Sequence, residues 1–310
     1  MKKWIGTILV LVLICACALA ESAHIAALKG PTAMGMVKMM DETTDYDFRI
    51  MGAADEITPL LVKGEIDIAA LPANLAAVLY QKTRGAIEVL NVNTLGVLYI
   101  AERGDSVHSV ADLKGRTIYT AGKGSTPEYA LNYILSENGL TPGRDVTIEY
   151  KSEHAECLAA MLNDPDVLAM LPQPFLTTAK ANAEDLRTAL NLTAEWNALD
   201  NGSALITGVV VARRAFVEEN PEVVADFLTQ YEASVEYVNT DTAGAAQLVE
   251  KFDIVPAAVA EKAIPACNIC FIDGKAMQKK LSGYLETLYA QNPDAVGGTL
   301  PDADFYYNAE

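Results

Sequence analysis

Small polar residues next to glycine or proline recur at four places where a strand-like segment gives way to a helix-like one. The start of a helix exposes backbone N–H donors and a partial positive charge, and ligands of open α/β sheets bind beyond the carboxyl ends of the strands. We therefore expect these junctions to bind a small solute through hydrogen bonds. The candidate residues are Gly30, Pro31, Thr32, Asn74, Ser125, Thr126 and Gln173. Helix capping is the alternative role for Thr32, Asn74 and Thr126.

Four larger side chains close to these junctions are suited to reading a flat or charged ligand. Glu128 and Tyr129 follow Thr126 in the first turn of a predicted helix, where Glu128 either accepts from an amine-bearing ligand or complements the helix dipole. Tyr99 and Trp196 are candidates for stacking on a flat ring, with core packing as the alternative. All four are included in the predicted ligand-binding set.

The patterns typical of catalytic and metal sites are missing from the sequence. It has no G-x-S-x-G or H-E-x-x-H motif, and the loop 122–126 lacks the spacing of a phosphate-binding P-loop. Cys267 and Cys270 form one C-x-x-C pair, which is compatible with separate buried thiols, a local disulfide, or a metal or redox site. We expect no cofactor, no metal and no catalytic residue.

The elements that would position the candidate residues alternate between strand-like and helix-like segments, which predicts an α/β fold with parallel strands. Their order divides the chain into a first lobe, residues 22–100 plus 209–310, and an inserted second lobe, residues 101–208. Crossings near residues 95–101 and 204–211 would form a hinge between the lobes. We expect the tail from Pro293 to wrap the surface without a core of its own.

Residues 1–20 have the features of an export signal: Lys2 and Lys3 precede an apolar run that is too short to span a bilayer. Ala18-Leu19-Ala20 fits a signal-peptidase site, whereas residues 14–17 resemble a lipobox in which Cys17 would receive a lipid. Of the two we expect a lipoprotein anchored outside the cell membrane; a periplasmic or secreted protein is the alternative.

The charge of the chain limits its partners. The formal net charge is −18, and removing residues 1–20 takes away two Lys and no acid, which leaves −20. Such a surface repels nucleic acid, so a DNA or RNA partner is not expected. The remaining length suits two domains, and we expect a monomer.

Several short motifs resemble those of ABC-transporter substrate-binding proteins of the periplasmic-binding-protein-like II class, in the branch that binds sulfonates, nitrate and thiamine precursors. The matching segments are the lipoprotein-like signal, Gly30-Pro31-Thr32, Lys63-Gly64-Glu65-Ile66-Asp67-Ile68-Ala69 and Val110-Ala111-Asp112-Leu113-Lys114-Gly115-Arg116. The resemblance implies two Rossmann-like lobes joined by two hinge strands, closure on a small molecule like a Venus flytrap, and delivery to an ABC permease in the membrane.

The resemblance leaves the ligand open. Helix N-termini suit a sulfonate-type anion, whereas Glu128, Tyr99 and Trp196 suit a flat heterocycle such as a pyrimidine or vitamin precursor. Of the two we expect the heterocycle. Two other roles would use the same cleft: a ligand-sensing module for a membrane receptor, and a pyrimidine-forming enzyme of the same fold.

Overall fold

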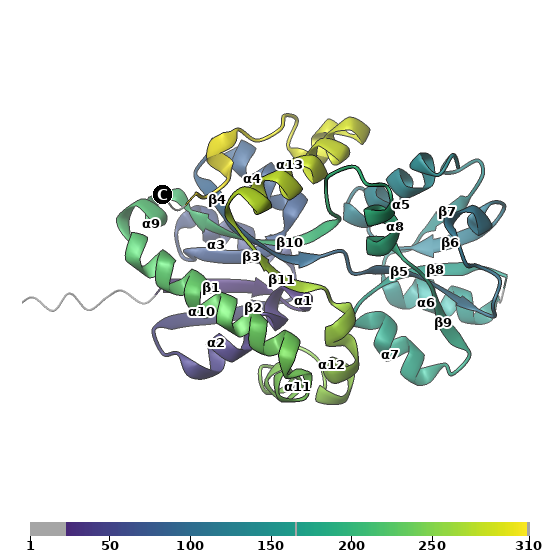
Figure 1. The fold of residues 1–310 in the computed structure, drawn as a ribbon, viewed down its shortest axis with the longest axis horizontal. Helices are drawn as coiled ribbons and strands as arrows, with labels where there is room; N and C mark the ends of the chain where they lie inside the picture. The colour runs from purple at the N-terminus through teal and green to yellow at the C-terminus, as the bar shows by residue number, and fades with distance from the viewer. Residues whose placement is uncertain (1–22, 165, 309–310) are drawn as a thin grey trace, which may run out of the picture.

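Two separate β-sheets, one in each lobe, organise the computed structural model, which describes residues 23–164 and 166–308 (Figure 1). The predicted signal, with Cys17 and the cleavage site after Ala20, lies outside the described residues. Within the described residues, no helix is both long and apolar enough to cross a bilayer.

The first sheet has the strand order β11-β4-β10-β3-β1-β2. Its strands are β1 (Ala23–Leu28), β2 (Tyr46–Met51), β3 (Ile68–Pro72), β4 (Ile87–Leu95), β10 (Ile206–Arg213) and β11 (Ile269–Ile272). β1 runs parallel to β2 and β3, whereas β10 is antiparallel to both β3 and β4. The carboxyl ends of β1 and β3 therefore meet at one edge of the sheet, beside the start of β10.

The second sheet has the order β7-β6-β8-β5-β9. Its strands are β5 (Leu98–Arg103), β6 (Thr117–Thr120), β7 (Thr147–Tyr150), β8 (Leu168–Pro172) and β9 (Leu186–Asn191). β6 runs parallel to β7 and β8, and β5 is antiparallel to β8. The carboxyl ends of β6 and β8 thus share an edge, as those of β1 and β3 do in the first sheet.

Helices cover both faces of each sheet (Figure 1). Those of the first lobe are α1 (Pro31–Met34), α2 (Val37–Glu42), α3 (Ala54–Lys63), α4 (Ala73–Thr83), α9 (Arg214–Glu219), α10 (Pro221–Thr240), α11 (Thr242–Lys251), α12 (Ala257–Ala263) and α13 (Gly274–Gln291). Those of the second lobe are α5 (Thr126–Glu137), α6 (His154–Asn163), α7 (Phe175–Asn182) and α8 (Leu192–Ala198). Short 3₁₀ turns are η1 (Val110–Leu113), η2 (Ile264–Ala266), η3 (Pro293–Val296) and η4 (Ala303–Phe305).

The long helix α10 shows why these segments are helical. Its buried side chains recur every three or four residues, which places them on one face of a helix with 3.6 residues per turn. They include Val224, Phe227, Tyr231, Val235 and Val238. This face packs with α1, α2, α11 and α12 on one side of the first sheet, while α3, α4 and α13 cover the other side.

The chain crosses between the lobes at residues 96–97 and again between α8 and β10. The core on the α13 side of the first sheet continues past these crossings to α5 and α8, so a single apolar cluster spans both lobes. The predicted mixed α/β fold with two lobes is confirmed. The C-terminal tail is joined to this cluster, because Phe305 is fully buried against Tyr80.

Candidate functional site

The first-lobe junction after β1 is fixed by hydrogen bonds of Thr32, one of which comes from the buried Asn93 side chain. The Thr32 hydroxyl donates to the Leu28 carbonyl at 2.6 Å, and the Thr32 carbonyl accepts from Asn93 Nδ2 at 3.2 Å. Gly208, at the start of β10, leaves the room for this contact, since a Cβ there would lie 2.5 Å from Asn93 Oδ1 and 2.6 Å from Thr32 Cγ2. Gly208 also pairs with Pro72 at the end of β3.

The remaining first-lobe candidates lie at the same edge of the sheet. Gly30 is buried with φ of 124°, a value that favours glycine, and is followed by Pro31 at the start of α1. Asn74 is half-buried in the first turn of α4, directly after the end of β3. The structure therefore brings the β1 and β3 junctions together around Gly208.

The second-lobe junction after β6 is a tight glycine loop. Gly122 has φ of 84°, and a Cβ there would lie 2.8 Å from Ser125 Oγ. The Ser125 hydroxyl donates to the Gly122 carbonyl at 2.7 Å, and the Gly124 N–H donates to Glu128 Oε2 at 2.5 Å. Glu128 thus braces its own loop, and with burial it raises the pKa of Tyr150.

Gln173 connects the β8 junction to the first crossing. Its backbone N–H donates to the Val97 carbonyl at 2.9 Å. Its side-chain Oε1 accepts from the Thr177 N–H at 3.2 Å and from the Thr177 hydroxyl at 2.8 Å, so it caps the start of α7. The peptide bond from Gln173 to Pro174 is cis.

The aromatic candidates are engaged within the protein. Tyr99 is buried, its hydroxyl donates to the Ala266 carbonyl at 2.7 Å, and burial raises its pKa to about 12. Trp196 is fully buried, with its indole N–H donating to Ser203 Oγ at 2.9 Å. Tyr133 and Tyr284 pack against its ring with centroids 4.7 and 5.8 Å away. Tyr99 and Trp196 therefore pack in the core, which was the alternative to stacking on a ligand, and neither ring has a free face for a ligand.

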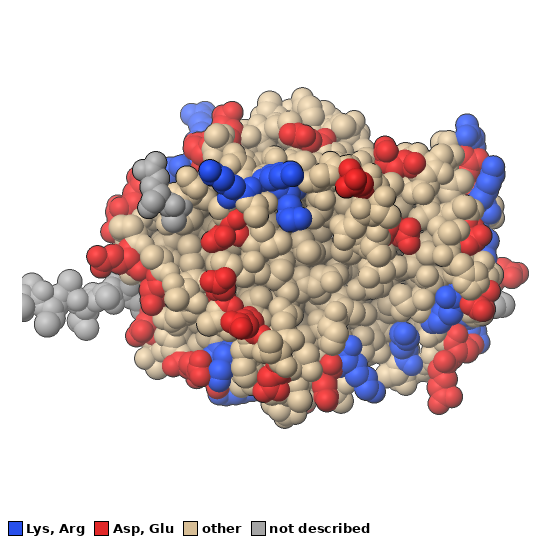
Figure 2. Space-filling view, in the orientation of Figure 1, with Lys and Arg blue, Asp and Glu red and all other residues tan. Residues whose placement is uncertain are grey.

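Two grooves lie along the seam between α5 of the second lobe and the C-terminal elements of the first. One, of about 560 Å³, includes Glu128 and Tyr129 opposite Gln291 and Asn292. The other, of about 520 Å³, lies beside Ser203 and Gly283. The middle of the face in Figure 2, where the lobes meet, carries few charged side chains.

The comparisons with known proteins agree with this architecture. A family model described as "ABC transporter, phosphonate, periplasmic substrate-binding protein" matches residues 33–262. The chain belongs to this family. It is an extracytoplasmic substrate-binding protein, and ABC importer proteins of this kind bind small molecules and work with a membrane permease. None of the curated proteins compared with the chain matches it in sequence.

Solved structures show the same fold for this binding protein. An ABC transporter protein from Parabacteroides distasonis superposes with a TM-score of 0.80 at 23% identity, over 94% of this chain and 100% of that one. The periplasmic aliphatic sulphonate binding protein SsuA from Escherichia coli gives 0.71 at 17% identity, over 93% of each chain. The alkanesulfonate-binding protein SsuA from Xanthomonas axonopodis pv. citri, bound to MOPS, gives 0.65 at 17% identity, over 93% and 98%.

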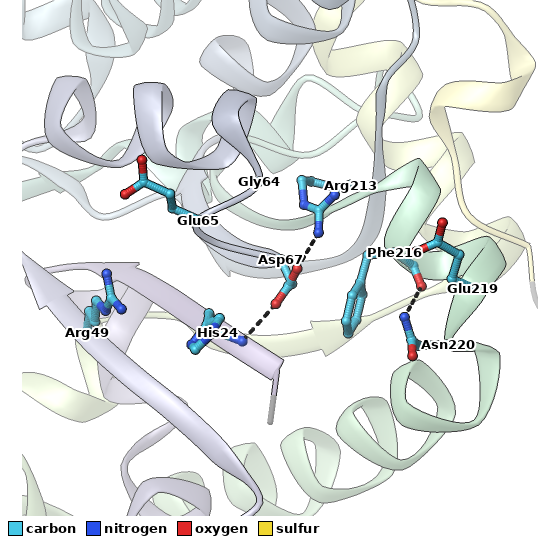
Figure 3. Close-up of a pocket in the computed structure, with 9 residues that line it drawn as sticks. All are labelled: His24, Arg49, Gly64, Glu65, Asp67, Arg213, Phe216, Glu219 and Asn220. Atoms are coloured by element: carbon cyan, nitrogen blue, oxygen red, sulfur yellow. Dashed lines mark hydrogen bonds and ion pairs between the residues drawn. The ribbon is translucent and has the colours of Figure 1, made fainter. Parts of the chain in front are cut away.

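The segment 63–67, which is part of the family resemblance, has a structural role at the end of the first sheet opposite the β1 and β3 junctions (Figure 3). Gly64 ends α3 in a left-handed conformation, and Asp67 enters β3. The Asp67 carboxylate accepts from the His24 N–H at 2.9 Å and pairs with Arg213, beside a cavity of about 410 Å³. Asp67 therefore joins the starts of β1 and β3 to the end of β10.

The cysteine and histidine side chains, which could support redox or metal chemistry, do not form a common site in the part of the chain that the structure describes. Cys267 and Cys270 are free thiols, and burial raises their pKa values to about 12, so of the three alternatives for this pair the structure has separate thiols. His24, His108 and His154 lie near Asp47, Asp105 and Phe175, respectively. Among the residues described, no three His, Cys, Asp or Glu side chains group as metal ligands.

Asn93 and Tyr284, which contact Thr32 and Thr126, were not predicted from the sequence. Asn93 has a visible signal, since it is one of four polar residues in the buried strand β4, with Glu88, Asn91 and Thr94, and is only 1% exposed. A buried amide needs hydrogen-bond partners, so its position could have pointed to a polar cluster beneath the β1 junction. Tyr284 carries no such signal, because a tyrosine on the buried face of a helix is ordinary core packing.

Proposed function

We propose that this binding protein captures a small anionic organic solute, of the phosphonate or sulfonate kind, between its lobes and presents it to the permease of an ABC importer. The observation that carries the proposal is the arrangement of helix starts. α4 begins at the β1–β3 edge of the first lobe, and α5 and α7 begin at the β6–β8 edge of the second. Each start offers N–H donors and a positive dipole end, the chemistry that anions prefer.

The side chains that favoured a flat heterocycle give it little support in the folded protein. Tyr99 and Trp196 are buried and hydrogen-bonded within the chain, and Glu128 accepts from its own loop. A buried ring would have to leave the core to stack on a ligand, whereas the hydroxyls of Thr32 and Ser125 at the helix starts need only rotate, so we favour the anion over the heterocycle. The phosphonate-binding family of this chain and the two sulfonate-binding SsuA proteins of the same fold support the same choice.

Binding would work without any bond being made or broken. A solute that contacts both lobes binds the closed arrangement more tightly than the open one and shifts the population toward it. Thr32 and Asn74 would contact it from the first lobe, with Ser125, Thr126 and Gln173 from the second. To donate to the anion, the Thr32 and Ser125 hydroxyls would rotate away from the Leu28 and Gly122 carbonyls. We also propose that the protein acts as a monomer and is tethered through Cys17.

The test is a thermal-shift screen of residues 22–310 against methylphosphonate, 2-aminoethylphosphonate, taurine and MOPS, with pyrimidines, nucleobases and amino acids as competing classes. Ligand at 100 times its Kd raises stability by about 2.7 kcal/mol, a clear shift. We expect a phosphonate or sulfonate to raise the unfolding temperature and to be recovered chemically unaltered, as checked by mass spectrometry. A pyrimidine hit would replace the anion with the heterocycle, and a chemically converted hit would make the protein an enzyme.

The site itself is tested by the double variant Thr32→Ala, Ser125→Ala. We expect its affinity for the best probe to fall about tenfold or more, since one hydroxyl is removed from the proposed site in each lobe. Thr229→Ala with Ser282→Ala, on outer surfaces of α10 and α13, is the matched control and should bind like the wild type. Equal affinities for the two double variants would contradict this site.

A further inference from the structure

A buried hydroxyl pair crosses from one lobe to the other at the start of α5. Tyr284, on α13 of the first lobe, is fully buried, and its hydroxyl lies 3.1 Å from Thr126 Oγ1 of the second lobe. Thr126 is 7% exposed, so neither group has bulk water as a ready partner. A buried hydroxyl left without a partner destabilises the fold, which favours keeping this pair together.

A second contact ties the same turn of α5 to the first lobe. The Tyr129 hydroxyl accepts from Asn292 Nδ2 at 2.9 Å, and the Tyr129 carbonyl accepts from Gln291 Nε2 at 3.1 Å. Gln291 ends α13, and Asn292 caps η3. Three hydrogen bonds from one C-terminal stretch therefore reach the first turn of α5.

The C-terminal stretch is itself fixed to the first lobe. Gly297, which ends η3, fits closely against α4, since a Cβ there would lie 3.0 Å from Gln81 Cβ. The stretch further on is held as well, with Tyr80 donating to Asp304. The start of α5 is thus held by a part of the first lobe that is itself packed against α4.

We infer that Tyr284 is a positioning residue for solute binding: through Thr126 it holds the ligand-facing start of α5 in the orientation that binds. This inference rests on the proposed function, because it assigns Ser125 and Thr126 to the solute site. Tyr284 packs on Trp196 and lies behind α5, so it sets affinity through Thr126 and not by contact with the solute.

The test compares Tyr284→Phe, Thr126→Val and the double variant in binding 2-aminoethylphosphonate and MOPS by calorimetry. Each single change should weaken binding about five- to tenfold, and the double variant should be no weaker than Thr126→Val alone, because both changes remove one contact. Thr126→Ser keeps the hydroxyl and should retain most of the affinity. Tyr289→Phe, the same chemical change on the same helix, should bind like the wild type.

Amide hydrogen exchange of residues 122–133 without any ligand gives an independent readout. We expect faster exchange there in Tyr284→Phe than in Tyr289→Phe, with exchange elsewhere in α13 unchanged. Unchanged affinity and exchange in Tyr284→Phe, or strictly additive losses in the double variant, would overturn the inference. If the wild type binds neither probe, the anion proposal fails, while the exchange comparison still decides whether Tyr284 holds α5.

Discussion

Asp67, at the entry to β3, forms an ion pair with Arg213 at the end of β10, and the Arg213 Nε also donates to the Ile66 carbonyl at 3.2 Å. The same carboxylate accepts from the backbone of His24 at the start of β1. One side chain thus fixes three strands of the first sheet at the end opposite the proposed solute site. The other end of these strands carries the junctions at Thr32 and Asn74 that form the proposed first-lobe site.

Replacing Asp67 with Asn should lower the free energy of unfolding by about 2–3 kcal/mol, since Arg213 would lose its charged partner in a mostly buried setting. Urea unfolding followed by circular dichroism measures the change. The control is Asp253→Asn, whose exposed pair with Lys29 should be worth less than about 0.5 kcal/mol. Equal midpoints for the two variants would show that Asp67 does not hold the sheet.

Gly96 in the first crossing should not tolerate a side chain. A Cβ there would lie 2.3 Å from Thr193 Oγ1 and 2.6 Å from Leu205 Cδ2, while the Gly96 carbonyl accepts from Thr193 and Asn268. Gly96→Ala should therefore cost about 1–3 kcal/mol and also weaken solute binding, because the crossing must shift.

The control for that substitution is Gly52→Ala, where a Cβ would meet nothing within 4 Å and φ is not positive. Thermal unfolding of the two variants side by side checks the expectation. A Gly96→Ala protein as stable as Gly52→Ala would mean that the crossing has room which the structure does not show.

Two buried glutamates should respond to pH in opposite directions. Burial alone would raise the pKa of Glu102, but the Ser106 hydroxyl, the Val107 N–H and Arg187 outweigh it and lower the pKa below 4.5. A lowered pKa stabilises the fold above 4.5 and stops doing so as the pH falls through the folded-state value. Glu102→Gln should therefore be less stable than wild type by about 2 kcal/mol at pH 7, and the gap should narrow below pH 4.5.

Glu88 supplies the contrast, because burial raises its pKa above 4.5. Its ionised form opposes folding at neutral pH, so Glu88→Gln should be at least as stable as wild type at pH 7. Urea unfolding of both variants at pH 7 and pH 3.5 tests the pair. If the gap between Glu102→Gln and wild type were the same at both values, the carboxylate would not be the stabilising group.

The sequence was sufficient to predict the fold because its signals are local and repeated. Strand-like runs alternate with helical periods, and Gly64 stops α3 in the left-handed conformation that the pattern suggests. The polar junctions at Thr32 and Asn74 could likewise be predicted from the sequence, since each comes within four residues of the end of a strand. Such features depend only on neighbouring residues.

What could not be read from the sequence depends on contacts between distant residues. Trp196 lies in a polar segment, yet Tyr133 and Tyr284 bury it from two other helices. Phe305 lies in a tail rich in Pro, Gly and Asp, yet it packs on Tyr80 more than 200 residues earlier. In both cases the local composition reflects the residues beside the aromatic ring in the sequence, whereas the ring itself is buried by residues that are distant in the sequence.

Trp196 also supplies a direct test of its place in the core. It is the single tryptophan of residues 22–310, because Trp4 belongs to the predicted signal. If its ring packs between Tyr133 and Tyr284, its emission should lie at short wavelength in the folded protein and shift to long wavelength only on unfolding. Binding of a phosphonate or sulfonate should shift the wavelength of this emission much less than unfolding does. Trp196→Phe should cost about 1–3 kcal/mol of stability, since core volume and the bond to Ser203 are lost, and its affinity should fall no more than that of Tyr284→Phe, because the indole acts on α5 only through packing. Strong quenching by the solute, together with a large loss of affinity in Trp196→Phe, would instead place the indole in the binding site.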